Sequence, residues 1–328
     1  TPAHIRQSGT ARRGGWDWRR EEVSETILQG DAIEKLRHIR EESINTCVTS
    51  PPYYNLRDYG EKGQIGREGT PEEFVEKLVG VFREVRRVLR PDGTLWVNIG
   101  DSYATRSGAQ PPTNTRNSCG HTQKRPPSGY KYKDLIGIPW LLAFALRADG
   151  WYLRQDIVWN KTNCMPESVR DRCTKSHEYI FLLSKSERYY FDTEAICEPI
   201  AASSQKRYQQ DIEHQAGSSR QPGKENGPMK AAGNGKTRNK RSVWSISTAR
   251  FKGAHFATFP EKLVEPCILA GCPTGGTVLD PFMGSGTTGA VSKRLGRNFV
   301  GVEINPEYCE IARKRIAEAA GFYEQMQI

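Results

Sequence analysis

The chain of 328 residues lacks the features that would place it in a membrane or outside the cell. Its longest nearly apolar run, Ile138–Leu146, is far shorter than the roughly 20 residues that a membrane-spanning helix needs. No charged segment followed by an apolar one opens the sequence, so we expect no secretory leader. The eight cysteines are irregularly spaced and include no Cys-x-x-Cys pair, which favours reduced thiols and predicts no metal site. We therefore expect a cytoplasmic protein without membrane contacts.

Acidic residues are scarce in two stretches. Ser102–Lys133 holds six basic residues and no acidic one, and Pro199–His255 holds eleven basic and three acidic residues. Because the net charge of the whole chain is +10, the remainder is slightly acidic. Both stretches are rich in Gly, Pro, Ser, Asn and Gln, so we predict long basic loops, with solvated linkers as the alternative. Basic charge gathered in this way favours a nucleic acid as the partner.

We expect the phosphate contacts to come from residues of both stretches. In the first they are Arg106, Arg116, Lys124 and Arg125, and in the second Lys206, Arg207, Arg220, Lys236, Arg238, Lys240 and Arg241.

Segments typical of strands alternate with segments typical of helices in the rest of the chain. Thr70-Pro71-Glu72-Glu73 predicts a helix start, with Thr70 as the cap and Glu73 completing a capping box. The predicted strands are Ile44–Thr49, Thr94–Ile99 after a turn at Pro91-Asp92-Gly93, Trp151–Trp159, Val278-Leu279, Phe299–Glu303, and a hairpin of Glu178–Leu183 with Arg188–Asp192. The other predicted helices are Pro139–Arg147, Glu261–Ala270, Thr287–Leu295 and Pro306–Ala320. This alternation predicts an α/β fold with a Rossmann-like, doubly wound, mostly parallel sheet that binds ligands at the carboxyl ends of its strands.

A glycine-rich turn, Asp280-Pro281-Phe282-Met283-Gly284-Ser285-Gly286-Thr287, follows a predicted strand and opens a predicted helix. Glycines allow a ligand close to the backbone, and the helix start offers free N–H groups. Glu303 ends the next strand, where an acid can bind ribose hydroxyls. No lysine follows the second glycine, so the turn differs from a phosphate-binding loop, and an adenosine without a phosphate chain fits better.

A second motif, Ser50-Pro51-Pro52-Tyr53, comes directly after the strand Ile44–Thr49. Two prolines hold the backbone extended and remove two N–H donors, which leaves carbonyl and Ser50 oxygens to accept hydrogen bonds. Tyr53 adds a flat ring for stacking. Acceptors beside an aromatic ring suit a planar amine such as a nucleobase. The spacing of the residues alone fits a purely structural Pro-Pro turn equally well.

Together these two motifs resemble the (S/D)PP(Y/F) and DPFxGSG motifs of the S-adenosylmethionine-dependent DNA amino-methyltransferases. The catalytic motif precedes the cofactor motif, as in the permuted β class. The resemblance begins at Leu28-Gln29-Gly30-Asp31 and includes Trp159-Asn160-Lys161 and Ser176-His177-Glu178-Tyr179. It implies an N-terminal arm (1–27), a catalytic half (28–198), a target-recognition region (199–255) and a cofactor-binding half (256–328).

The resemblance also implies the roles of single residues. S-adenosyl-L-methionine would be bound by Asp31, Asp280, Phe282, Gly284, Ser285, Gly286, Thr287 and Glu303, with Lys262 covering the methionine moiety. Ser50 and the Pro51 carbonyl would accept from the target amine in the Ser50-Pro51-Pro52-Tyr53 motif, and Tyr53 would stack on the flipped base. No covalent intermediate is required, and we interpret Cys267 as a core residue inside a helix.

Ser50 at the first motif position favours N4 of cytosine in double-stranded DNA as the methylated atom, because aspartate there is more typical of adenine-N6 enzymes. Adenine-N6 transfer, methylation of RNA or of protein glutamine, and a non-catalytic DNA-binding protein remain as alternatives. The resemblance further implies a bacterial, archaeal or phage protein, a possible homodimer, and a restriction endonuclease that acts separately.

Overall fold

The computed structural model describes residues 24–56, 60–61, 63–104, 129–201, 203–205, 236–248 and 259–325. Most of the two predicted basic loops lies outside these ranges, together with residues 1–23. Seven of the predicted DNA contacts also lie outside the described residues: Arg106, Arg116, Lys124, Arg125, Lys206, Arg207 and Arg220. No helix among the described residues is long and apolar enough to cross a membrane.

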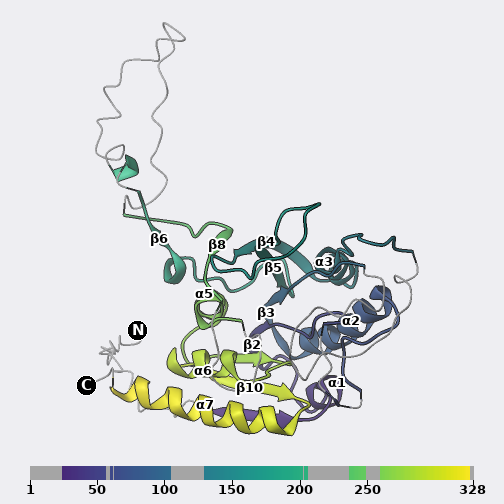
Figure 1. Ribbon diagram of the computed structural model, residues 1–328. Helices are drawn as coiled ribbons and strands as arrows, with labels where there is room; N and C mark the ends of the chain where they lie inside the picture. Colours follow the sequence, from purple (N-terminus) through teal and green to yellow (C-terminus); the bar gives the residue numbers. More distant parts are fainter. Residues whose placement is uncertain are drawn as a thin grey trace, which may run out of the picture.

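An eight-stranded sheet forms the centre of the molecule (Figure 1). Its strands in spatial order are β1 (Glu25–Gln29), β10 (Asn298–Glu303), β9 (Thr277–Asp280), β2 (Ile44–Thr49), β3 (Leu89–Ile99), β5 (His177–Ser184), β4 (Tyr152–Asn160) and β8 (Val243–Ser245). Only β5 runs antiparallel to its neighbours among these strands, so the prediction of a mostly parallel sheet is confirmed.

Helices cover both faces of the sheet. One face packs against α1 (Ala32–Leu36), α2 (Pro71–Val88) and α3 (Ile138–Ala148), and the other against α5 (Glu261–Gly271), α6 (Thr287–Arg294) and α7 (Pro306–Gln325). The long helix α7 lies beside α6 and the edge of the sheet formed by β1 and β10 (Figure 1). The fold is therefore doubly wound, as the alternation predicts.

The central strands divide their side chains between two hydrophobic cores. In β3, Leu95, Val97 and Ile99 belong to the core beneath α1–α3, whereas Trp96 belongs to the core beneath α5–α7. Side chains alternate along a strand, so a continuous apolar run supplies both faces of a buried sheet. Each fully buried aliphatic or aromatic side chain stabilises the fold by about 1.5–3 kcal/mol relative to an exposed one.

The start of α2 matches its prediction. Thr70 Oγ1 accepts a hydrogen bond of 3.2 Å from the Glu73 N–H, and Pro71 occupies the first turn. The predicted capping box is wrong in one respect, because the Glu73 carboxylate accepts from the Gly69 N–H at 3.1 Å, one residue before Thr70.

The predicted hairpin of Glu178–Leu183 with Arg188–Asp192 is wrong. Residues 188–192 form no strand, because β5 pairs along one edge with β3 and along the other with β4. With both edges of β5 occupied, a return strand has no partner. The Tyr190 and Asp192 N–H groups instead donate to the carbonyls of Asp92 and Ala270.

The prediction that a turn at Pro91-Asp92-Gly93 separates the helix from the next strand is also wrong. The strand β3 begins at Leu89 and includes this segment as an irregularity in its pairing with β2. The Asp92 and Gly93 carbonyls accept from the N–H groups of Tyr190 and Lys185, and these bonds keep the segment within the sheet.

The end of the sheet at β8 lies within the region predicted to recognise the target. In 199–255, β8 joins the main sheet beside β4, and β7 (Thr237–Arg238) pairs with β6 (Glu198–Pro199) in a separate two-stranded sheet. The described part of this region is thus continuous with the catalytic half, and the domain boundaries stay a prediction.

We predict that Thr70→Ala lowers the free energy of unfolding by about 1 kcal/mol, because the Glu73 N–H loses its cap acceptor. Urea denaturation followed by circular dichroism measures the change. Thr70→Asp is the matched control, since an aspartate retains the cap and should stay close to the wild type. Equal losses in both variants would contradict the capping role.

Candidate active site

The two sequence motifs lie side by side at the carboxyl ends of neighbouring strands. The motif Ser50-Pro51-Pro52-Tyr53 follows β2, the glycine-rich turn follows β9, and β2 pairs with β9 through Thr46 and Val278. In an open α/β sheet this edge is where ligands bind. The fold thus joins two segments that are far apart in the chain.

A buried hydrogen bond connects the two motifs directly. Thr49 Oγ1 donates to Asp280 Oδ1 at 2.6 Å, and Thr288 Oγ1 donates to Asp280 Oδ2 at 2.7 Å. The Phe282 N–H also donates to Oδ1 at 3.1 Å. Burial raises the pKa of the Asp280 carboxyl to about 6, although these three hydrogen bonds act in the opposite direction. Asp280 therefore holds the turn against the Thr49 end of β2.

Glu303 holds the other side of the glycine-rich turn. Its Oε2 accepts from the Gly284 N–H at 2.9 Å and its Oε1 from the Asn305 N–H at 2.8 Å. Its own carbonyl accepts from the Gly30 N–H at 2.9 Å. Burial raises the pKa of the Glu303 carboxyl, and the two hydrogen bonds to backbone N–H groups oppose that rise. One residue thus orders three loops at this edge of the sheet.

Gly286 allows α7 to approach the start of α6. Its φ of 79° lies in the left-handed region, and a Cβ there would lie 2.8 Å from Ala312 Cβ. A side chain at this position would be both strained and crowded. The glycine accordingly serves close helix packing beside the turn.

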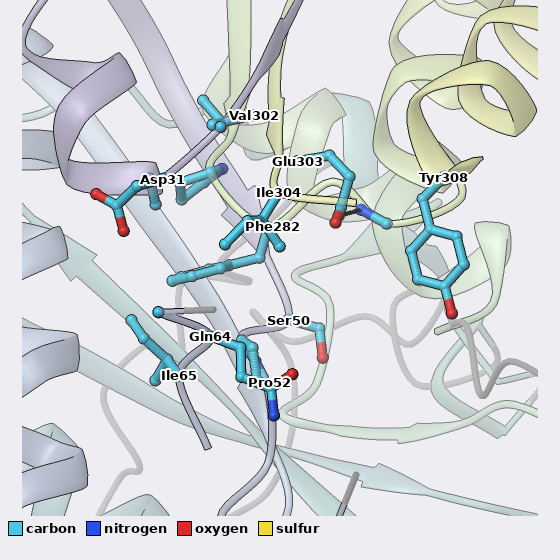
Figure 2. Close-up of a pocket in the computed structure, with 15 residues that line it drawn as sticks. Asp31, Ser50, Pro52, Gln64, Ile65, Phe282, Val302, Glu303, Ile304 and Tyr308 are labelled. Atoms are coloured by element: carbon cyan, nitrogen blue, oxygen red, sulfur yellow. Dashed lines mark hydrogen bonds between the residues drawn. The ribbon is translucent and has the colours of Figure 1, made fainter. Parts of the chain in front are cut away.

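A pocket with an empty volume of about 620 Å³ opens between the two motifs (Figure 2). Six of the predicted site residues line it: Asp31, Ser50, Pro52, Phe282, Gly284 and Glu303. Figure 2 shows Glu303 and Ile304 on one side of the pocket and Ser50, Pro52 and Ile65 on the other. The described lining contains two carboxylates and no Lys, Arg or His, which suits hydroxyl groups and a cationic ligand better than phosphates.

Other predicted cofactor residues lie behind the lining or away from it. Asp280, Ser285 and Thr287 are all buried. Arg315 donates to Thr287 Oγ1 at 2.8 Å and to Ser285 Oγ at 3.3 Å, which anchors the turn to α7. Lys262 lies on the first turn of α5 and is not among the described residues that line the pocket.

The pocket also includes residues that the sequence analysis did not single out. They are Ala32, Gly63, Gln64, Ile65, Val302, Ile304 and Tyr308, and Gly30 and Pro281, which belong to quoted motifs but were given no role there. Ile304 directly follows Glu303, so its position was inferable from the end of the strand. Nothing in the local sequence around Gln64 and Ile65 indicates that this loop reaches the pocket.

Tyr53 is held by polar side chains from β3 and β5. Its hydroxyl donates to Glu178 Oε2 at 2.7 Å and lies 3.4 Å from Asn98 Oδ1, and a Cβ on Gly100 would lie 2.6 Å from its ring. The absence of a side chain at Gly100 therefore leaves room for the ring. Pro51 is buried, and no described residue donates a backbone hydrogen bond to its carbonyl.

Four of the predicted DNA contacts lie among the described residues. Arg238 Nη2 and Arg241 Nε each lie 3.4 Å from Glu198 Oε2, and Lys240 Nζ lies 3.5 Å from Glu198 Oε1. Lys236 is exposed. The Glu198 carboxylate is thus shared by three basic side chains near β8, and these four residues together carry a net positive charge.

Cys267 is buried inside α5, and its thiol donates to the Leu263 carbonyl at 3.3 Å. Burial raises the pKa of this thiol far above its ordinary value, so the thiolate form is disfavoured. This environment agrees with a core residue.

We predict that Asp280→Asn changes how stability depends on pH. The pKa of Asp280 is about 6 in the folded protein and 3.8 ordinarily. The stability that the protonated carboxyl contributes is therefore fully present below about pH 4 and is lost as the pH rises through about 6. The asparagine cannot ionise, so its stability does not change over this interval while that of the wild type falls. The unfolding free energy of the variant minus that of the wild type should therefore increase by up to roughly 3 kcal/mol between pH 4 and a pH above 6. Urea denaturation at several pH values measures it. A difference independent of pH would contradict the assignment.

Comparisons with known proteins agree with this geometry. The family model described as DNA methylase matches residues 44–314. The Type II methyltransferase M.Cfr9I of Citrobacter freundii is 48% identical over 293 residues, covering 89% of this chain and 87% of that protein. The Type II methyltransferase M.SmaI of Serratia marcescens is 48% identical over 292 residues, covering 88% and 90%.

Two solved structures share the fold. The PvuII DNA methyltransferase, which is cytosine-N4-specific, has a TM-score of 0.60 at 20% identity and covers 92% of both chains. A putative DNA modification methylase of Thermus thermophilus, solved in complex with S-adenosyl-L-methionine, has a TM-score of 0.56 at 25% identity and covers 91% of this chain and 96% of that one. This chain therefore belongs to the DNA methylase family of S-adenosylmethionine-dependent amino-methyltransferases.

Proposed function

We propose that this protein is a site-specific DNA methyltransferase that methylates N4 of cytosine in double-stranded DNA. The observation that carries the proposal is the position of Ser50, which lines the same pocket as Glu303 and Phe282. An acceptor for the target amine and the groups suited to the cofactor therefore share one cavity. Its curated relatives are named Type II methyltransferases, which favours a separately acting restriction endonuclease as its functional partner.

The pocket residues fit S-adenosyl-L-methionine. The Glu303 carboxylate is suited to the ribose hydroxyls, Phe282 and Ile304 provide apolar walls for a planar ring, and the Asp31 carboxylate favours a positive charge. Asp31 Oδ1 also accepts from the Glu34 N–H at 2.9 Å as the cap of α1, which fixes its position. When bound, the cofactor supplies an electrophilic methyl group on a sulfonium.

The work of the protein is to position the target amine and to shape its electron density. The lone pair of an exocyclic amine is delocalised into the base, so the amine is a poor nucleophile. Ser50 Oγ and the Pro51 carbonyl can accept hydrogen bonds from its two hydrogens and so favour a localised lone pair. Tyr53, pinned through its hydroxyl to Glu178, offers a fixed ring for a base that has left the duplex stack.

The basic residues near β8 are proposed to bind DNA phosphates. Arg238, Lys240 and Arg241 lie together around Glu198, and a shared carboxylate limits the directions in which these long side chains extend. Such a group would position the duplex, while a few polar side chains of the predicted target-recognition region (199–255) would distinguish its bases.

Adenine-N6 methylation is the alternative within the same family, and a non-catalytic DNA-binding protein is the alternative outside it. Digestion of methylated DNA to nucleosides, followed by mass spectrometry, separates all three. N4-methylcytosine is the expected product. N6-methyladenine would overturn the choice of base, and the absence of any methylated nucleoside would overturn the proposed activity.

We predict that Ser50→Ala lowers the methyl-transfer rate by roughly a hundredfold or more, because the target amine loses a preorganised partner. Incorporation of tritiated methyl groups into unmethylated plasmid DNA measures the rate. Ser43→Ala is the matched control, since Ser43 precedes β2 at the opposite end of that strand.

Cys267→Ser should keep its methyl-transfer activity, because no nucleophilic cysteine is needed. A folded but inactive Cys267→Ser would contradict the direct transfer.

We predict that DNA affinity falls steeply with salt and that Lys236→Gln lowers the slope of log K against log salt by about 1. Fluorescence anisotropy with a labelled duplex at several salt concentrations measures the slope. Lys314→Gln removes an equal, exposed charge on α7, near the opposite edge of the sheet, and should leave the slope unchanged. A slope close to zero in the wild type would count against the DNA contacts.

A further inference from the structure

At the edge of the sheet that carries the two motifs, four neighbouring strands bear polar side chains on one face. Val48, Trp96, Trp159 and Ile180 all belong to the core beneath α5–α7. Side chains alternate along a strand, so a residue two positions away from each of these, toward the edge of the sheet where the two motifs lie, is on the same face. These residues are Ser50, Asn98, Lys161 and Glu178, and they form a polar row at the edge of that core.

Hydrogen bonds connect this row in one direction. Lys161 Nζ donates to Glu178 Oε1, and Asn98 Nδ2 donates to Glu178 Oε2 at 3.2 Å. Asn98 Oδ1 accepts from Ser50 Oγ at 3.4 Å and lies at the same distance from the Tyr53 hydroxyl, whose shorter bond goes to Glu178. The side chains of Lys161 and Glu178 are only 21% and 12% exposed, so solvent competes weakly for this pair.

The direction of these hydrogen bonds follows from the groups that can only accept a hydrogen bond. An ionised carboxylate and a backbone carbonyl have no proton to donate. Asn98 Nδ2 faces two such groups, Glu178 Oε2 and the Tyr179 carbonyl, each at 3.2 Å. The amide oxygen of Asn98 must therefore point to Ser50, and the Ser50 hydroxyl must donate to it.

We infer that Glu178, acting through Asn98, sets the Ser50 hydroxyl so that its proton is engaged inside the protein and its lone pairs face the target amine. This inference rests on the proposed function. A serine hydroxyl can both donate and accept, and a proton aimed at the amine would bind the nitrogen lone pair that must attack. Asn98 and Glu178 are positioning residues, since neither is among the described residues lining the pocket.

The decisive test compares Glu178→Gln with the wild type in single-turnover methyl transfer. A glutamine places an N–H donor where Asn98 Nδ2 had an acceptor, so the Asn98 amide must either rotate, and lose its bond to the Tyr179 carbonyl, or move away. In both cases the Ser50 hydroxyl loses its fixed acceptor. The Ser50 proton then turns toward the amine, and we expect the rate to fall roughly ten- to a hundredfold. The dissociation constants of S-adenosyl-L-methionine and DNA should stay within about twofold. Glu187→Gln, an exposed carboxylate just beyond the other end of β5, is the matched control.

A reciprocal variant distinguishes positioning from simple damage. Ser50→Asp places a carboxylate against the Asn98 amide oxygen, and the two acceptors repel. In the Glu178→Gln background only the Tyr179 carbonyl still holds Asn98 Nδ2, so Asn98 rotates more readily and can donate to that aspartate. The double variant should therefore be faster than Ser50→Asp alone. Losses that multiply in the double variant would overturn the inference.

Asn98→Ala carries the test if Glu178→Gln does not fold, because it removes the acceptor of Ser50 and retains the bonds of Glu178 to Lys161 and Tyr53. A rate at least about tenfold lower is expected. An unchanged rate in folded Glu178→Gln or Asn98→Ala, with Ser50→Ala inactive, overturns the inference and leaves the proposed function in place. A fully active Ser50→Ala would instead overturn the catalytic role of Ser50.

Discussion

The hydrogen bond between Thr49 and Asp280 is the constraint on which the site depends. It joins the last residue of β2 to the first residue of the glycine-rich turn, 231 positions apart, with both side chains fully buried. A buried carboxylate without partners is costly, so its hydrogen bonds to Thr49, Thr288 and Phe282 must form together. Since β2 and β9 are neighbours in the sheet, this bond fixes how far the motif containing Ser50 lies from the turn that leads to Glu303.

Charge is separated across the molecule in accordance with its two proposed ligands. The described pocket lining carries the carboxylates of Asp31 and Glu303 and no basic side chain, whereas Arg238, Lys240 and Arg241 gather around Glu198 near the opposite end of the sheet. The net charge of +10 therefore gives little information about the pocket. A described pocket lining without basic side chains disfavours phosphates, which agrees with the proposal that the duplex backbone binds the basic surface and the uncharged base enters the site.

Local patterns in the sequence correctly predicted the core strands and the Thr70 cap of α2, because each depends on residues a few positions apart. The failures have non-local causes. The return strand at 188–192 was wrong because β3 and β4 already occupy both edges of β5. The turn at Pro91–Gly93 was wrong because carbonyls there pair with Lys185 and Tyr190. Of the residues predicted to bind the cofactor, Asp31, Phe282, Gly284 and Glu303 line the pocket, whereas the sequence could not tell that Asp280 is buried behind it.

The sequence by itself determined the fold class, the alternation of strands and helices, and the chemical groups available at the ends of β2, β9 and β10, since these follow from local periodicity and motif order. Only the tertiary structure decided which of those groups meet. Gln64 and Ile65 reach the pocket from a loop without a local signal. The direction of the hydrogen bonds from Glu178 to Ser50 depends on Asn98, 80 positions before Glu178. Strand order sets such contacts, and strand order results from packing of the whole sheet.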